Sequence, residues 1–313
     1  MDRKRFRGRD FLDLVDYSRE EIHYLLDTAC ELKRLDMMGI RDEKPLKGKI
    51  VALLFEKPSL RTRVSFEVAV RHLGGESFYL GSQEVGLGQR EAVKDVAQVL
   101  DRMVDGLVIR TFAHENLLEI ARFASIPVIN GLSDLYHPCQ VLGDLLTIQE
   151  KKGKLRGLKI CFLGDGNNVC HSWINAASIL GLELVVSTPE RYRISSQIWE
   201  EAQERGKKNG ARIIYEVDPQ KAIEGAEVVY TDVWASMGKE AEKEERKVFL
   251  QPYQVNSHLL SKASPDFIVM HCMPAKRGEE ITDEVMDGPH SVVVDEAENR
   301  LHAQKALLTL ILS

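Results

Sequence analysis

Short apolar runs alternate with helical patterns along most of the chain. The first is IVALLF at residues 50–55, followed by KPS and a helical stretch that ends at residues 74–75. A short continuous run is typical of a strand buried on both faces, as in a parallel sheet. The same order of strand, turn and helix then recurs. Further strands of the first half are expected at residues 106–110 and 126–130, and helices at 19–37, 116–124 and 138–150.

A new series of strand–helix units begins after the polar segment KKGKLRG at residues 151–157. Its strands are expected at residues 158–163, 182–187, 212–217, 227–231, 267–271 and 291–295. Alternating strands and helices predict parallel sheets with right-handed crossovers. We therefore expect an α/β fold of two domains, residues 1–150 and 151–313, each a parallel sheet flanked by helices. The last helix, about residues 297–312, is expected to pack back on the first domain.

Length and charge narrow the class of protein. A chain of 313 residues exceeds the size at which one core stops growing, which agrees with two domains. Its net charge of -6 argues against nucleic acid as a partner, because affinity for a phosphate backbone needs a basic face. Apolar runs are all too short to span a bilayer, so no membrane partner is expected. The five cysteines include no C-x-x-C pair, and we expect a reducing, cytoplasmic location.

The densest chemical cluster is PSLRTR at residues 58–63, between a buried strand and a helix. Helix N-termini attract anions, because their first N–H groups lack internal partners and the dipole is positive there. Ser59 and Thr62 add hydroxyl donors, and arginine adds a fork suited to phosphate. Arg61 and Arg63 lie two residues apart on nearly opposite helix faces, so we expect Arg61 to bind the anion and Arg63 to be structural. A capping serine with two solvated arginines is an equal alternative on these residues alone.

Three more candidates lie at the ends of predicted strands in the first half, where open α/β sheets bind ligands. Arg110 closes one strand, and His137 and Gln140 flank the start of a helix. Together they can donate to a carbonyl oxygen, accept from an amide and hold an anion. This set suits a small carbonyl compound that bears a phosphate. Taken alone, His137 is more simply a hydrogen-bonded loop histidine.

The sequence GDGNN at residues 164–168 follows a strand and begins a helix, which invites a dinucleotide-binding interpretation. It lacks the third glycine of that motif, and the next strand ends without a carboxylate for a ribose, so we expect no nicotinamide cofactor. Asn167 and Asn168 instead offer amides suited to a zwitterion. The charged segment at residues 239–247 is most simply a solvated helical face, with a lid over a substrate as the alternative.

Two other strand ends of the second half carry polar groups. Asp232 can pair with an ammonium group, and Cys272 is either polar site lining or a small buried hydrophobe. His171 beside Cys170, and His271 beside Cys272, do not have metal-ligand spacing. No metal is therefore expected.

Eight motifs resemble the carbamoyltransferase family, in the family's order and over essentially the whole chain. They are SLRTR, SFE, RTF, HPCQ, GDGNN, DVWASMG, HCMP and ENRLHAQKA. The resemblance implies a carbamoyl-phosphate domain followed by an amino-acid domain, no cofactor, and a homotrimer or a multiple of trimers. The pattern DxxxSMG is similar to that of members that use ornithine and differs from that of members that use aspartate.

The resemblance also implies roles for individual residues. Carbamoyl phosphate would be held by Ser59, Leu60, Arg61, Thr62, Arg110, His137, Pro138, Cys139, Gln140, Cys272, Met273 and Arg300, of which the last three come from the second half. Leu60, where many relatives have threonine, can offer only its backbone N–H. Ornithine would be bound by Asn168, Asp232, Ser236 and Met237. The catalytic set would be Arg61, Arg110, His137, Gln140, Asp232 and Cys272.

The activity that the resemblance implies is transfer of the carbamoyl group of carbamoyl phosphate to the side-chain amine of L-ornithine, by direct attack through a tetrahedral intermediate. Within the family, the alternatives are enzymes that act on aspartate, putrescine or an acylated ornithine. A binding protein that senses an amino acid is an alternative of another class, and a dehydrogenase is a third. The residues leave open whether the enzyme serves synthesis or breakdown of arginine.

Overall fold

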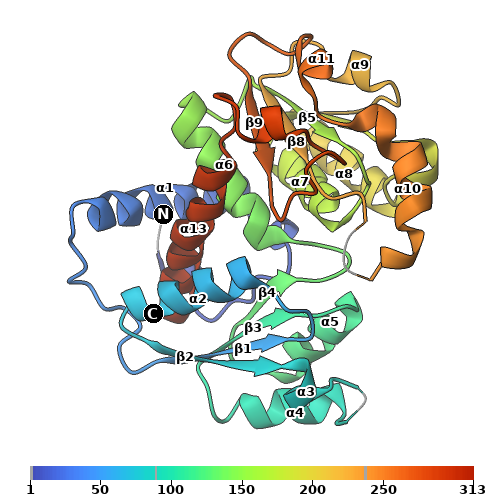
Figure 1. Ribbon diagram of the computed structural model, residues 1–313. Helices are drawn as coiled ribbons and strands as arrows, with labels where there is room; N and C mark the ends of the chain where they lie inside the picture. The colour runs from blue at the N-terminus through green and yellow to red at the C-terminus, as the bar shows by residue number, and fades with distance from the viewer. Residues whose placement is uncertain (1–2, 89, 236–237) are drawn as a thin grey trace. The chain divides into compact units, whose positions relative to one another are not determined.

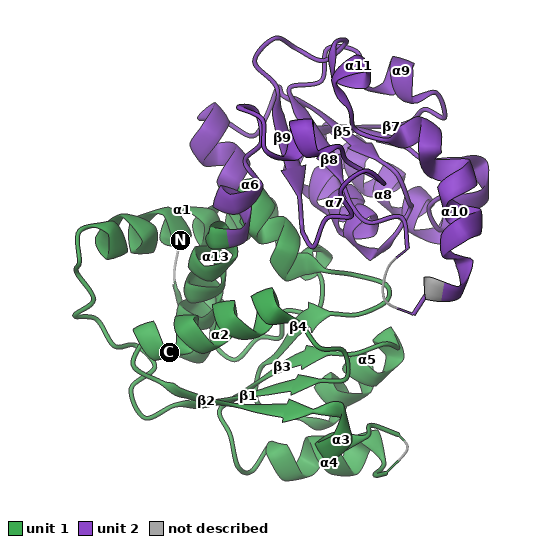
Figure 2. Cartoon of the chain, viewed as in Figure 1, with its two compact units in different colours: residues 1–146, 298–313 green, residues 147–297 purple. Residues whose placement is uncertain are grey.

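A computed structural model describes residues 3–88, 90–235 and 238–313. The chain divides into two compact units, coloured separately in Figure 2. Unit 1 consists of Met1–Leu146 and Glu298–Ser313, and unit 2 of Thr147–Ala297. The expected division at residue 150 and the observed one both lie within helix α6 (Pro138–Lys152). The last part of the chain belongs to unit 1, which bears on the position of Arg300 below.

Unit 1 is built on a four-stranded parallel sheet in the order β2-β1-β3-β4. The strands are β1 (Ile50–Phe55), β2 (Glu76–Gly81), β3 (Gly106–Arg110) and β4 (Val128–Leu132). Its helices are η1 (Arg3–Arg5), η2 (Leu14–Asp16), α1 (Arg19–Met37), α2 (Leu60–His72), α3 (Ser82–Val85), α4 (Val93–Leu100), α5 (His114–Phe123), the start of α6, and the larger part of α13 (Val293–Leu312). The predicted α/β class with parallel sheets is confirmed.

Helices cover both faces of the unit 1 sheet, as Figure 1 shows. Alternate residues of β3 point to opposite faces. Leu107 and Ile109 pack in one core with residues of α4 and α5. Gly106 faces the other side, where a Cβ would lie 2.9 Å from Leu312 of α13. The C-terminal helix therefore packs directly on the sheet of unit 1.

Unit 2 is built on a five-stranded parallel sheet in the order β7-β6-β5-β8-β9. The strands are β5 (Lys159–Leu163), β6 (Glu183–Ser187), β7 (Arg212–Tyr215), β8 (Val228–Thr231) and β9 (Ile268–His271). The helices are α7 (Asn168–Leu180), η3 (Glu190–Tyr192), α8 (Ser196–Asn209), α9 (Pro219–Ala222), η4 (Glu240–Glu242), α10 (Lys243–Leu250), η5 (Gln251–Tyr253), α11 (Ser257–Leu260) and α12 (Asp283–Met286). Strand order reverses at β5, where doubly wound sheets bind ligands.

One predicted strand is wrong. Residues 291–295 were expected to form a strand, but only Ser291 makes a bridge, to Val269, and α13 begins at Val293. A short apolar run cannot be assigned to strand or helix by its pattern alone. Here the valines begin a 20-residue helix, whose later residues are mostly buried.

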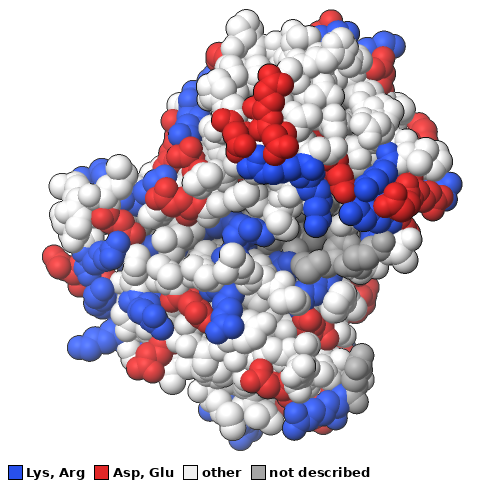
Figure 3. All heavy atoms as spheres, in the orientation of Figure 1, with Lys and Arg blue, Asp and Glu red and all other residues white. Residues whose placement is uncertain are grey.

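On the face shown in Figure 3, acidic and basic side chains are interspersed. Within the described ranges, every helix is too short or too polar for a bilayer span.

Candidate active site

The predicted anion site lies at the N-terminus of α2 in unit 1. Ser59 caps the helix, and its hydroxyl accepts from the Thr62 backbone N–H at 3.3 Å. The two hydroxyl oxygens are 3.0 Å apart, so a direct hydrogen bond joins them as well. Leu60 is the first helical residue and its side chain is exposed, so only its backbone faces the helix end. The local sequence thus builds a helix N-terminus with hydroxyl donors beside it, which favours an anionic ligand.

Arg61 and Arg63 have different surroundings, as their spacing predicts. The Arg63 side chain is half exposed, donates to Glu67 at 2.9 Å and lies over the Tyr79 ring at 4.1 Å. It is therefore held against the outside of the helix. Arg61 lies in the first turn and is less exposed. The position of Arg61 agrees with an anion-binding role, which stays a prediction.

Arg300 contributes to this end of α2 from the C-terminal helix. Its Nη2 atom donates to the Thr62 hydroxyl at 2.7 Å, and the contact is buried. Arg300 was expected in the second half, but its helix packs in unit 1 and the contact lies within one unit. A buried guanidinium at a helix N-terminus adds positive charge where the dipole is already positive.

Arg110, His137 and Arg300 are buried near one another in unit 1. Burial lowers the pKa of His137 well below its usual value, and the charges of Arg300 and Arg110 lower it further. The imidazole is therefore neutral at neutral pH, with one N–H donor and one acceptor nitrogen. Two fixed cations and one neutral donor suit a phosphate and a carbonyl oxygen.

Gln140 and Cys139 lie in the first turn of α6, which starts at Pro138. The Gln140 amide Nε2 donates to Asp144 Oδ1 at 2.8 Å, so its carbonyl oxygen is the end that can accept from an amide ligand. Cys139 donates its thiol to the Asn130 carbonyl at 3.3 Å. Burial raises the pKa of Cys139 to about 12, so the thiol stays protonated. Cys139 can therefore offer a ligand little beyond its backbone.

Sequence reasoning missed two carboxylates in unit 1. Asp144 is fully buried and orients Gln140 from four residues along the same helix face. Glu56 accepts from the Thr111 hydroxyl and from the Phe112 backbone N–H, which ties the end of β1 to the end of β3. The sequence does indicate Glu56, because Glu56 and Thr111 each directly follow a predicted strand. Asp144 had no such signal because only the fold shows that its side chain is buried.

In unit 2, three loops meet at the carboxyl ends of β5, β8 and β9. Asp232 Oδ2 accepts from Asn167 Nδ2 at 2.7 Å, and Oδ1 accepts from the Cys272 thiol at 2.9 Å. The Val233 backbone N–H also donates to Oδ1, at 2.8 Å. Asn167 caps α7 with its own side-chain oxygen, and Asn168 is the first residue of that helix. The Asp232 carboxylate is thus held by neutral donors and can attract a cation.

Four more residues of unit 2 were expected to bind a substrate. Ser236 and Met237 lie outside the described residues. Met273 has a left-handed backbone, with φ of 51°, and its N–H donates to His271 Nδ1 at 2.9 Å. Cys272 is half-buried beside it. The structure therefore places Cys272 and Asp232 together, and Met273 in the adjoining turn.

Asp232, His271 and Cys272 have donor atoms within 4.8 Å of one another, a grouping that the sequence spacing did not reveal. A carboxylate, an imidazole and a thiol are ligands that zinc accepts. However, His271 Nδ1 accepts from Met273 and Nε2 lies 3.1 Å from Glu280. Metal binding by His271 would break one of these buried contacts, so the geometry favours a hydrogen-bonded cluster.

The glycine motif at the end of β5 has a packing role. A Cβ on Gly166 would lie 2.7 Å from the Tyr192 carbonyl oxygen and 2.8 Å from the Ile194 nitrogen. Backbone at the end of η3 occupies this space, so only glycine fits here. The glycine is therefore explained without a bound nucleotide.

Arg246 is an exception to the predicted solvated face at residues 239–247, of which most described residues are exposed. Its guanidinium is buried, lies 2.9 Å from Asp165 Oδ2 and donates to the Trp234 carbonyl at 3.0 Å. It also stacks over the Tyr192 ring at 4.4 Å. Burial raises the pKa of Asp165, and Arg246 opposes the rise. Arg246 thus ties helix α10 to the loop that carries Asn167.

Replacing Arg246 by methionine is expected to lower the free energy of unfolding by about 3 kcal/mol, because Asp165 would be left buried without its main partner. Urea unfolding followed by tryptophan fluorescence measures this free energy. The matched control is Arg191→Met, which removes an exposed pair with Glu245 and should cost less than about 1 kcal/mol. Equal losses of unfolding free energy in the two variants would contradict the assignment of Arg246 as the buried partner of Asp165.

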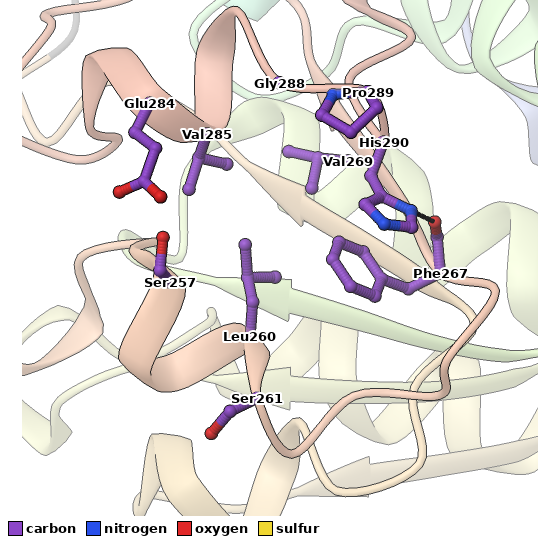
Figure 4. Close-up of a pocket in the computed structure, with 10 residues that line it drawn as sticks. All are labelled: Ser257, Leu260, Ser261, Phe267, Val269, Glu284, Val285, Gly288, Pro289 and His290. Carbon is purple, nitrogen blue, oxygen red and sulfur yellow. Dashed lines mark hydrogen bonds between the residues drawn. The ribbon is translucent and has the colours of Figure 1, made fainter.

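A cavity of about 280 Å³ lies elsewhere in unit 2, at the start of β9 (Figure 4). Its lining is mostly apolar, with Leu260, Phe267, Val269 and Val285 around the space and Glu284 at one side. None of the predicted site residues lines it, and it has no arginine or lysine for an anion. We therefore do not assign a substrate to it.

Both halves of the chain match models of one protein family. Residues 9–150 match the family description "Aspartate/ornithine carbamoyltransferase, carbamoyl-P binding domain", and residues 156–311 match "Aspartate/ornithine carbamoyltransferase, Asp/Orn binding domain". The chain is 52% identical over 307 residues to a protein named ornithine carbamoyltransferase from Carboxydothermus hydrogenoformans, covering 98% of each chain. It is 50% identical over 305 residues to one from Pyrococcus furiosus whose name adds "anabolic", covering 97% and 96%. A solved ornithine carbamoyltransferase from Pyrococcus furiosus superposes with a TM-score of 0.95 at 50% identity, covering 98% of each chain.

Proposed function

Because the chain belongs to the aspartate/ornithine carbamoyltransferase family and is a transferase, we propose that it carbamoylates the side-chain amine of L-ornithine. The substrates are carbamoyl phosphate and L-ornithine, and the products are L-citrulline and phosphate. The observation that carries the choice of amine is the Asp232 carboxylate, held by Asn167 and Cys272. Such a site attracts an ammonium group and would repel the second carboxylate of aspartate.

Unit 1 binds carbamoyl phosphate in this proposal. The phosphate group of this substrate lies at the N-terminus of α2 and is contacted by Ser59, Arg61 and Arg300. The carbamoyl oxygen accepts from Arg110, His137 and Thr62, and the carbamoyl amide donates to Gln140. The hydrogen bond between Arg300 and Thr62 and the buried positions of Arg110 and His137 support these roles.

The chemistry is a direct acyl transfer. The uncharged ornithine amine forms a bond to the carbonyl carbon, and charge develops on the carbonyl oxygen. Donors aimed at that oxygen stabilise the tetrahedral intermediate, typically by about 3 kcal/mol each. The bond from carbon to the phosphate oxygen then breaks, phosphate leaves with the electron pair, and the former amine nitrogen gives its proton to the departing phosphate.

Unit 2 binds ornithine and manages its amine. The amine is mostly protonated at neutral pH if it resembles that of lysine, so a group must orient it and help it lose a proton. Asp232 is suited to attract the amine. The Cys272 thiol, which donates a hydrogen bond to Asp232, is proposed to help move the proton of the amine. Asn168, Ser236 and Met237 are proposed to hold the rest of the amino acid.

His137 gives a pH dependence with a defined sign. Its folded pKa is below the ordinary value of 6.5, so the unfolded chain takes up this proton first. The free energy of unfolding should therefore fall as the pH drops below about 6.5, by about 1 kcal/mol per pH unit from this residue. Urea unfolding between pH 7.5 and 5.5 measures the slope in the native chain and in His137→Gln. Identical slopes would show that His137 is not held neutral.

The choice of amine is tested with a panel of acceptors at saturating carbamoyl phosphate. Carbamoylation of ornithine should exceed that of aspartate, putrescine and an acylated ornithine by orders of magnitude in kcat/KM. Preference for any of the other three amines would overturn the proposal while leaving the family assignment intact.

We also propose a homotrimer, or a multiple of trimers, in the cytoplasm, acting in arginine biosynthesis. The family resemblance supports the trimer, and the relative whose name includes "anabolic" supports the direction. The cysteines in the structure are free thiols, which fits a reducing compartment. Light scattering on the purified chain tests the trimer.

A further inference from the structure

A polar seam joins α1 and the C-terminal helix α13 within unit 1. Lys33 Nζ donates to Asn299 Oδ1 at 2.7 Å, and Lys305 Nζ lies 2.5 Å from Asp36 Oδ2. His302 Nδ1 lies 3.8 Å from the same oxygen. On α13, positions 299, 302 and 305 recur every three residues and share one face, and on α1 positions 33 and 36 have the same spacing. In the observed register, the polar groups of the two helices therefore face one another.

Asp36 is the centre of this seam. Its side chain and that of Lys305 are buried, with 7% and 4% exposed. Burial alone would raise the pKa of Asp36, but hydrogen bonds from Lys305 and Arg41 lower it, so the carboxylate is charged. Arg41 Nε lies 3.0 Å from Oδ1, and His72 Nδ1 lies 3.7 Å from Oδ2. One carboxylate thus contacts α13, the segment after α1 and the last residue of α2.

Helix α13 also contacts α2, through Arg300 and Thr62 at the proposed substrate end of unit 1. Arg300 also packs closely on α6, since a Cβ on Gly143 would lie 3.2 Å from the Arg300 nitrogen and 3.3 Å from its Cα. A slip of α13 by one turn would move Arg300 by about 5.4 Å. Apolar packing tolerates such a slip better than a buried ion pair does, because the slip would leave both charges unpaired.

We propose that Asp36 and Lys305 are positioning residues for the binding of carbamoyl phosphate. They fix the register of α13 against α1 and thereby hold Arg300 at Thr62. The inference rests on the proposed function, because it assumes that the ligand at the N-terminus of α2 is carbamoyl phosphate. It gives a catalytic consequence to residues that do not touch the substrate.

The test uses the full-length protein with three variants and a control. Asp36→Asn removes one charge, the double variant Asp36→Asn/Lys305→Met removes both, and Lys305→Arg keeps the pair. The first two should raise KM for carbamoyl phosphate about tenfold, since a misplaced binding group weakens substrate contacts. KM for ornithine at saturating carbamoyl phosphate should stay within twofold, and Lys305→Arg should retain most of the affinity for carbamoyl phosphate. The control, Glu31→Gln, removes an exposed pair with Arg34 on α1 and should change neither constant.

The outcomes separate this inference from the proposed function. An unchanged KM for carbamoyl phosphate in the folded double variant would overturn the positioning role. So would equal changes in both KM values, which indicate general damage. Titration calorimetry with inorganic phosphate tests the seam independently of turnover, and there too the double variant should bind more weakly than the Glu31→Gln control. A third outcome would contradict only the proposed function. In it, phosphate binds more weakly to the double variant, but the native chain transfers no carbamoyl group.

Discussion

Replacing Arg61 by alanine is expected to lower turnover by at least a hundredfold, while the fold is retained. The residue lies in the first turn of α2, next to the Ser59 cap and the contact between Thr62 and Arg300. Its guanidinium is proposed to neutralise the departing phosphate, and removal of one such transition-state contact costs about 10²- to 10³-fold in kcat. Initial rates of phosphate release and circular dichroism on the same preparation measure activity and fold together.

Arg63→Ala is the matched control for that variant. Arg63 lies two residues away on the same helix, but its side chain pairs with Glu67 and covers Tyr79. Its loss should change turnover less than about threefold, because an exposed ion pair contributes little. A normal rate in Arg61→Ala, or an equal loss in both variants, would contradict the assignment of the anion site.

Replacing Asp232 by asparagine is expected to raise KM for ornithine by at least a hundredfold and to leave KM for carbamoyl phosphate nearly unchanged. Asparagine has almost the same shape but lacks the charge that attracts the ammonium group. It also cannot accept from both Asn167 and Cys272, which now donate to the two carboxylate oxygens. Steady-state rates with each substrate varied at saturation of the other measure the two constants.

Cys272→Ser gives a comparison for this variant. The serine hydroxyl can still donate to Asp232, so the carboxylate keeps its charge and position. Its effect on KM for ornithine should be at least tenfold smaller than that of Asp232→Asn. Comparable losses for both substrates in Asp232→Asn would show that Asp232 supports the fold and does not bind the amino acid.

Much of the scaffold could be predicted from local pattern. The apolar runs at residues 50–55 and 106–110 coincide with β1 and β3, and the Ser18 and Glu21 capping box begins α1. These elements are determined by residues close together in the chain. The run at residues 291–295 failed because its apolar residues fit a strand and a helix start equally well, and the contacts of α13 decide between them.

The site could be predicted only in part, for the same physical reason. Ser59, Arg61 and Thr62 form a recognisable cluster because a helix N-terminus is a local feature. Arg246 lies in a run of charges that resembles a solvated face, and only its contact with Asp165, 81 positions earlier, shows that it is buried. The seam of Asp36 and Lys305 joins residues near the two ends of the chain, and no sequence spacing could indicate that contact.

The central claim is that this chain transfers a carbamoyl group to ornithine. The most direct measurement is the simultaneous release of citrulline and phosphate from carbamoyl phosphate and L-ornithine by the purified protein. One citrulline is expected for each phosphate, at a rate that depends on ornithine and falls at least a hundredfold in Arg61→Ala. Phosphate release without citrulline, or no reaction with ornithine while another amine is carbamoylated, would contradict it.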